Sequence, residues 1–165
     1  MKYLLLIFAL LIPSILLADP SCEDKGKLYP ICSDQKSAFE KLAAKAVEEK
    51  KMVLTVFGAD WCPWCHSLHR VLHGAEKNEY LLSEIGLYRA RDKVPSGEKV
   101  MQELLGHSSL KEAPKGVPVM ALYNPKTKKA VFIDTEPLEK NTANSKGHDS
   151  AEVFAAIEKA RQKLK

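Results

Sequence analysis

Apolar residues repeat at helical spacing in several stretches of the chain. After a Ser/Asp start they recur about every four positions as far as Val47, with lysine and glutamate between them, which predicts an amphipathic helix. The last stripe of apolar residues follows Ser150, which is expected to cap its helix. The predicted helices cover residues 34–50, the stretch from Cys62 to Gly74, and residues 76–85, 98–105 and 150–164.

Shorter apolar runs predict the strands. Residues 52–57 form an apolar run that contains one threonine and is rich in β-branched residues, which is typical of a strand buried on both faces. Residues 117–123 and 130–134 read as two strands joined by a hairpin turn, and residues 87–94 as a further strand. Residues 136–149 lack periodicity and are expected to form a mobile surface loop. This order of elements predicts one α/β domain with a central mixed sheet.

An apolar run opens the chain. Residues 3–18 follow a single lysine and fall short of the roughly 20 residues that a membrane-spanning helix needs. They predict a secretory signal peptide cleaved near Ala18, with an uncleaved anchor as the alternative. The protein is therefore expected to be exported, and to be periplasmic if its source is Gram-negative. The expected organisation is a signal peptide over residues 1–18, an N-terminal segment over 19–33 and a folded domain over 34–165.

The charge of the chain is close to balanced. It has 25 Lys and Arg against 21 Asp and Glu, a net charge of +4, and removal of residues 1–18 leaves 24 against 21, or +3. These charges are dispersed and form no basic stripe, so nucleic acid is not expected as a partner.

The chemistry is concentrated in Trp61-Cys62-Pro63-Trp64-Cys65-His66. Cys62 falls where a buried strand turns into a helix, and the unpaired N–H groups of a helix N-terminus stabilise a thiolate. Cys65, one turn further on, is expected to be more enclosed and to attack the mixed disulfide that Cys62 forms. The same spacing makes half a zinc site, but no second Cys-x-x-Cys is present. A redox centre is therefore favoured, and neither a metal site nor a cofactor is assigned.

The other two cysteines, Cys22 and Cys32, enclose nine residues ahead of the first helix. In an oxidising compartment they are expected to form a structural disulfide, which stabilises the fold by about 2–3 kcal/mol. The alternative is a second redox pair that relays electrons, although its spacing lacks the helix terminus that activates a thiol.

With these motifs the chain resembles the thioredoxin superfamily over most of residues 34–165. The resemblance rests on Phe57-Gly58-Ala59-Asp60-Trp61-Cys62-Pro63-Trp64-Cys65, on Gly116-Val117-Pro118 and on the terminal hairpin and helix. The lead-in to the first cysteine is similar to that of the C-terminal domain of the DsbD transporter, and the small exported format is similar to DsbH-like proteins. The resemblance implies a thioredoxin fold and a protein thiol–disulfide oxidoreductase.

The resemblance also implies roles for particular residues. In this family the proline that Pro118 matches is cis and faces the redox centre, and the backbone of the preceding residue, here Val117, pairs with the substrate. Thioredoxins carry a buried acid six positions before the first cysteine, and Val56 stands there in this chain. His69 lies beside the buried stripe of its helix and is the nearest replacement for proton exchange with Cys65. The alternative is that His69 is a packed histidine at the sheet edge.

The remaining side chains near the motif have simpler expectations. His66 and His73 share a helix face with the cysteines, but ligands spread over three turns of one helix are too far apart for one tetrahedral ion, so both are expected in solvent. Trp61 is expected to pack in the core, and Trp64 to be exposed as a platform for substrate polypeptide. Asp60 is either a solvated charge or a group that raises the pKa of the first cysteine.

The sequence therefore predicts an exported oxidoreductase in which Cys62 attacks and Cys65 resolves. Pro63 and Trp64 add no charge between the thiols, which favours a reductase or isomerase over a strong oxidant. The expected partners are cysteine-containing protein substrates and a membrane thiol–disulfide electron donor, and the expected state is a monomer. The alternative function is a redox-inactive polypeptide-binding module or a metal chaperone on the same fold.

Overall fold

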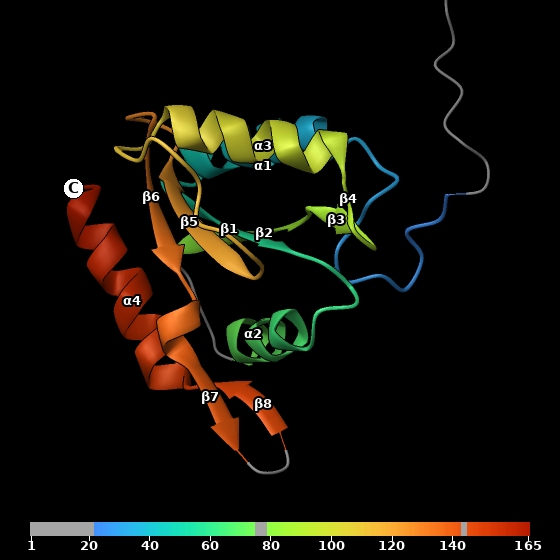
Figure 1. Cartoon of the computed structure of the whole chain (residues 1–165). Helices are drawn as coiled ribbons and strands as arrows, with labels where there is room; N and C mark the ends of the chain where they lie inside the picture. Colours follow the sequence, from blue (N-terminus) through green and yellow to red (C-terminus); the bar gives the residue numbers. More distant parts are fainter. Residues whose placement is uncertain (1–21, 75–78, 143–144) are drawn as a thin grey trace, which may run out of the picture.

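The computed structural model describes residues 22–74, 79–142 and 145–165 (Figure 1). The predicted signal peptide, residues 1–18, lies outside these ranges, as do the first residues of the N-terminal segment. Of the helices within these ranges, none combines the length and apolarity that crossing a membrane requires.

A mixed four-stranded sheet forms the centre of the fold and confirms the predicted α/β class. Its strands are β1 (Met52–Gly58), β2 (Tyr80–Gly86), β5 (Val119–Asn124) and β6 (Lys129–Asp134). They lie in the order β2-β1-β5-β6, where β1 is parallel to β2 and the two other pairs are antiparallel. The hairpin predicted between the strands that are now β5 and β6 is confirmed.

Helices cover both faces of this sheet. In Figure 1, α1 (Gln35–Glu48) and α3 (Pro95–Gly106) lie over one face, and α2 (Pro63–His73) and α4 (Ser150–Lys163) lie over the other. Helix α1 begins at its predicted place, because the Asp34 side chain accepts a hydrogen bond from the Ser37 N–H at 3.1 Å. Helix α4 is capped by Asp149, whose side chain accepts from the Glu152 N–H, and not by Ser150 as expected.

The side chains of β1 alternate between two hydrophobic cores. Leu54 and Val56 pack with residues of α2 and α4, whereas Val53 and Phe57 pack with residues of α1 and α3. A strand covered on both faces has no solvent side, which is why its sequence is a continuous apolar run. This strand carries the chain directly to the cysteine motif.

Residues 80–86 form a strand, so the helix predicted over residues 76–85 is wrong there. Leu81 and Ile85 are four positions apart, a spacing that fits one face of a strand as well as one face of a helix. Parallel pairing with β1 decides between the two, since Leu81 and Ile85 pack in the α1/α3 core while Leu82 packs in the other.

The single strand predicted over residues 87–94 is also wrong. The structure has two short antiparallel strands there, β3 (Tyr88–Arg89) and β4 (Asp92–Lys93). Between them Ala90 has a φ of 51°, which turns the chain back on itself. The helix that follows begins at Pro95, earlier than expected, because a proline at the first helical position has no N–H to leave unpaired.

The described residues of the polar stretch predicted as a mobile loop, residues 136–149, instead include two paired strands. A 3-10 turn (Glu136–Leu138) leads into the antiparallel strands β7 (Glu139–Thr142) and β8 (Ser145–His148). β8 packs against α2, and the His148 N–H donates to the Ser67 hydroxyl at 3.1 Å. The hairpin lacks an apolar pattern because its order comes from contact with a distant helix.

Candidate active site

The strand β1 delivers Cys62 to the N-terminus of helix α2. Cys62 is the N-cap residue, and Pro63 occupies the first turn of the helix. The backbone N–H of Cys65 donates to the Cys62 sulfur at 3.2 Å, so the thiol caps the helix as a serine hydroxyl would. The sequence therefore places this sulfur where a negative charge is stabilised by the helix end.

Neither thiol is in a disulfide, and their pKa values are shifted in opposite directions. A hydrogen bond from the Cys65 side chain, with backbone N–H groups of Cys65 and Trp64, lowers the pKa of Cys62 from 9.0 to about 7. The same side-chain hydrogen bond, together with burial, raises the pKa of Cys65 far above its usual value. Cys62 is 3% exposed and Cys65 is fully buried. At neutral pH the pair is a partly ionised nucleophile beside a protonated thiol.

Val117 and Pro118 lie directly beside this pair. The Cys62 sulfur is 3.5 Å from the Val117 carbonyl oxygen, and the peptide bond between Val117 and Pro118 is cis, as the resemblance implies. The buried Thr135 hydroxyl donates a hydrogen bond to the Pro118 carbonyl oxygen. This bond holds the segment of Val117 and Pro118 against the end of β6. The segment that the resemblance assigns to substrate binding therefore borders the Cys62 sulfur.

The N-terminal segment reaches under the thiols, which sequence reasoning missed. Cys22 and Cys32 form a disulfide with an S–S distance of 2.05 Å. Between them, Tyr29 is fully buried, and its hydroxyl donates to the Cys65 carbonyl oxygen at 3.5 Å. Burial raises the pKa of this tyrosine. No pattern in this polar segment marks Tyr29, because its burial depends on residues far along the chain.

Asp60 holds this segment in place. Its carboxylate accepts hydrogen bonds from the backbone N–H groups of Leu28 and Tyr29, at 2.9 and 3.1 Å. Asp60 is therefore a hydrogen-bonded carboxylate and not a solvated charge, the first of its two expected roles. Its role is to join the turn before the cysteines to the N-terminal segment.

The environments of Trp61 and Trp64 are the reverse of those expected from the sequence. Trp61 is 57% exposed, although it was expected in the core, and Trp64, expected to be exposed, is partly buried against the core. The ring of Trp64 meets that of His148 edge-on, with centroids 5.8 Å apart. The hairpin predicted as a mobile loop supplies this covering ring, which is why Trp64 is less exposed than expected.

The His69 side chain pairs with a residue of β2, which does not support its suggested role in proton exchange with Cys65. Its Nδ1 atom lies 2.6 Å from a carboxylate oxygen of Glu84 on β2, and in the described part of the chain no hydrogen bond joins it to Cys65. The alternative, a packed histidine at the sheet edge with a satisfied ring, describes its position. Val56, at the position of the thioredoxin acid, is fully buried in the α2/α4 core. His66 is exposed, and its Nε2 contacts the Asp60 carbonyl.

The hairpin β7–β8 also brings charge to the thiols. Glu139, the first residue of β7, acts on Cys62 through its negative charge and raises the pKa of that thiol, against the larger lowering effects. No local pattern indicates this effect, because 77 positions separate the two residues along the chain.

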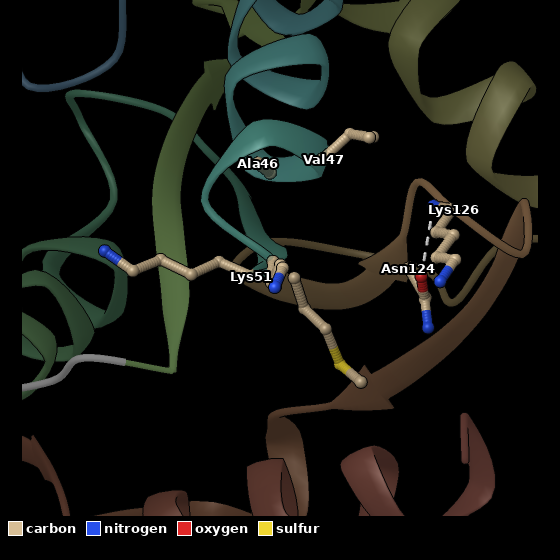
Figure 2. Close-up of a pocket in the computed structure, with 7 residues that line it drawn as sticks. Ala46, Val47, Lys51, Asn124 and Lys126 are labelled. Carbon is tan, nitrogen blue, oxygen red and sulfur yellow. Dashed lines mark hydrogen bonds between the residues drawn. The ribbon is translucent and has the colours of Figure 1, made fainter.

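Two surface hollows flank different ends of the sheet. One, of about 400 Å³, borders the cysteine site and is lined by Trp61, Tyr88, Ala90, Arg91, Gly116 and Val117. Figure 2 shows the other, of about 430 Å³. In it, Ala46 and Val47 of α1 lie across from Asn124, the last residue of β5, and from Lys126 in the turn that follows. Met52, at the start of β1, also lines it, so it lies at the opposite end of the strand from the thiols.

The comparison with protein families agrees with the fold. The model of a thioredoxin-like family matches residues 34–125. A comparison with curated proteins finds no match. Among solved structures, the chain is similar to the disulphide isomerase from Xylella fastidiosa Temecula1, with 21% identity and a TM-score of 0.49, over 63% of this chain and 76% of that chain.

Proposed function

Since the chain belongs to the thioredoxin-like family and has its α/β fold, we propose that it is an exported thiol–disulfide oxidoreductase acting on protein substrates through Cys62 and Cys65. The observation that carries the proposal is the contrast between the thiols. The sulfur at the helix N-cap has a pKa of about 7, while its buried neighbour one turn away stays protonated. This contrast supports Cys62 as the attacking sulfur and Cys65 as the resolving sulfur.

The reaction proceeds as two thiol–disulfide exchanges. The Cys62 thiolate attacks one sulfur of a substrate disulfide, forming a Cys62–substrate bond and releasing the second substrate sulfur as a thiolate that takes up a proton. Cys65 then loses its proton and attacks the Cys62 sulfur, so the Cys62–Cys65 disulfide forms and the first substrate sulfur leaves as a thiolate. Two electrons pass from the dithiol to the substrate. When the second attack comes from another substrate thiol, the outcome is isomerisation.

The surroundings of the sulfur favour an extended polypeptide as substrate. The Val117 carbonyl is already within contact of Cys62, and the hollow beside it is bordered by the exposed ring of Trp61. An aromatic platform beside the Val117 backbone suits a peptide segment, whose main chain pairs while its side chains rest on apolar surface.

We assign the reductase or isomerase direction because no positive side chain lies between the two cysteines. A pKa of about 7 is that of a moderately stabilised thiolate, and strong oxidants in this fold stabilise theirs much further. We propose that a membrane thiol–disulfide donor returns the electrons. Equilibration with glutathione is expected to give a potential below about −200 mV, and a value near about −120 mV would reverse the direction.

Insulin reduction with dithiothreitol tests the activity itself. The wild type is expected to accelerate precipitation of the insulin chains, and Cys62→Ser is expected to abolish that acceleration. Cys22→Ser/Cys32→Ser is the matched control, because it removes two sulfurs without touching the dithiol. Equal rates for wild type and Cys62→Ser would show instead a redox-inactive binding module.

A further inference from the structure

Three potential metal ligands meet between helix α2 and strand β2. His69 and His73 lie one turn apart on α2, with ring centroids separated by 4.1 Å. Both approach the carboxylate of Glu84 on β2: the His69 Nδ1 lies 2.6 Å from Oε1 and the His73 Nε2 lies 3.6 Å from Oε2. One ligand atom from each residue lies within 4.8 Å of the other two.

Strand β2 supplies a third potential ligand, Glu84, which helix α2 by itself does not provide. Glu84 is the registered partner of Val56, and like Val56 it points to the α2 side of the sheet. Ligands spread along α2 from Cys62 to His73 would extend about 16 Å, too far for one ion. Two histidines at i and i+4 are within reach of one ion, and a strand running beside the helix completes the set.

We propose that His69, His73 and Glu84 bind a divalent transition-metal ion of the zinc class. Two imidazole nitrogens and one carboxylate oxygen are a ligand set that such ions prefer, with a fourth position left for water. A tetrahedral ion with bonds of about 2.0–2.1 Å holds its ligand atoms about 3.3 Å apart. The present separations lie on both sides of that value, so small side-chain rotations create the geometry. His73 is half exposed, which gives an ion a way in.

The convergence of both rings on one carboxylate goes beyond what a simple ion pair requires. A hydrogen bond between Glu84 and His69 needs only one imidazole, whereas here a second ring is directed at the other carboxylate oxygen. A bound ion satisfies all three groups at once and joins α2, which carries the thiols, to β2. The site uses no sulfur, so it is independent of the proposed redox function.

Zinc binding to the oxidised protein tests the site. Oxidation to the Cys62–Cys65 disulfide removes the thiols as competing ligands, and a chelator followed by dialysis removes any metal already bound. Calorimetric titration of the full protein with zinc chloride is expected to give one ion per chain with a dissociation constant on the order of micromolar or tighter. Saturating zinc is expected to raise the melting temperature by about 5 °C or more.

Variants assign the ligands. His73→Gln changes a half-exposed side chain and is expected to weaken zinc binding at least about tenfold while the circular dichroism spectrum is unchanged. Glu84→Gln is expected to do the same. His66→Gln, an exposed histidine of the same helix, is the matched control and is expected to bind zinc like the wild type. Millimolar or substoichiometric binding by the wild type, or full binding by His73→Gln, would overturn the proposal.

Discussion

The ring of Tyr29 occupies the space that a side chain at Gly58 would need. A Cβ built on Gly58 lies 2.3 Å from the tyrosine ring, and Gly58 is the last residue of β1, four positions before the attacking cysteine. The absence of a side chain at this position therefore lets the N-terminal segment pack under the active-site helix.

We expect Gly58→Ala to destabilise the protein by about 1–3 kcal/mol, because the added methyl group forces the buried tyrosine or the strand to move. Urea unfolding with tryptophan fluorescence measures the loss. Gly106→Ala, at the end of α3 where an added Cβ meets nothing within 4 Å, is the control and is expected to be neutral or slightly stabilising. Equal stability of the two variants would contradict the packing role of Tyr29.

The disulfide between Cys22 and Cys32 is expected to stabilise the fold without taking part in turnover. Cys22→Ser/Cys32→Ser should lower the free energy of unfolding by about 2–3 kcal/mol, because the unfolded chain regains the freedom of a short closed loop. The remaining folded fraction should reduce insulin at the wild-type rate. A large loss of rate in fully folded protein would instead indicate that this pair relays electrons.

The acidity of Cys62 is expected to respond to Glu139. Alkylation by iodoacetamide should follow a single titration with a midpoint near pH 7 in the wild type. Glu139→Gln removes a negative charge that disfavours the thiolate, so the midpoint should fall. Glu136→Gln, on the preceding exposed turn, is the control and should leave the midpoint in place. A rise of the midpoint in Glu139→Gln would show that Glu139 does not act on Cys62 through the repulsion of its charge.

The same titration should appear in the stability of the reduced protein. The pKa of Cys62 is lowered on folding, from 9.0 to about 7, so the folded state is stabilised by the thiolate. That contribution is fully present above about pH 9 and is lost as the pH falls through about 7. Unfolding curves of wild type and Cys62→Ser between pH 6 and 8.5 should therefore diverge as the pH rises. Parallel curves would contradict the lowered pKa of Cys62.

Trp64 is expected to report the redox state. It lies between the cysteines and against the ring of His148, whereas Trp61 is largely exposed. Trp61→Phe should keep the change in fluorescence between dithiol and disulfide, and Trp64→Phe should lose it. If the signal follows Trp61 instead, the exposed ring is the one that senses the disulfide.

Much of the site could be predicted because its order is local. An apolar run makes β1, the next residues form a turn, and Pro63 starts a helix whose first N–H groups meet the Cys62 sulfur. Each step depends on neighbours in the chain, so pattern and spacing are sufficient to predict it. The failures are of another kind. Residues 80–86 fit both a helix pattern and a strand pattern, and residues 136–149 fit neither. In both places contact with a distant element selected the outcome, pairing with β1 in the first and packing against α2 in the second.

By itself, then, the sequence determined the α/β order, the reactive cysteine at a helix N-terminus and the enclosed cysteine one turn beyond. Only the tertiary structure decided what surrounds them. Tyr29 lies under the thiols, Glu139 brings charge to them, and Glu84 meets two histidines of their helix, each from a segment far away along the chain. Such contacts depend on which faces of the sheet and helices meet, and that is settled by burial and pairing across the whole fold.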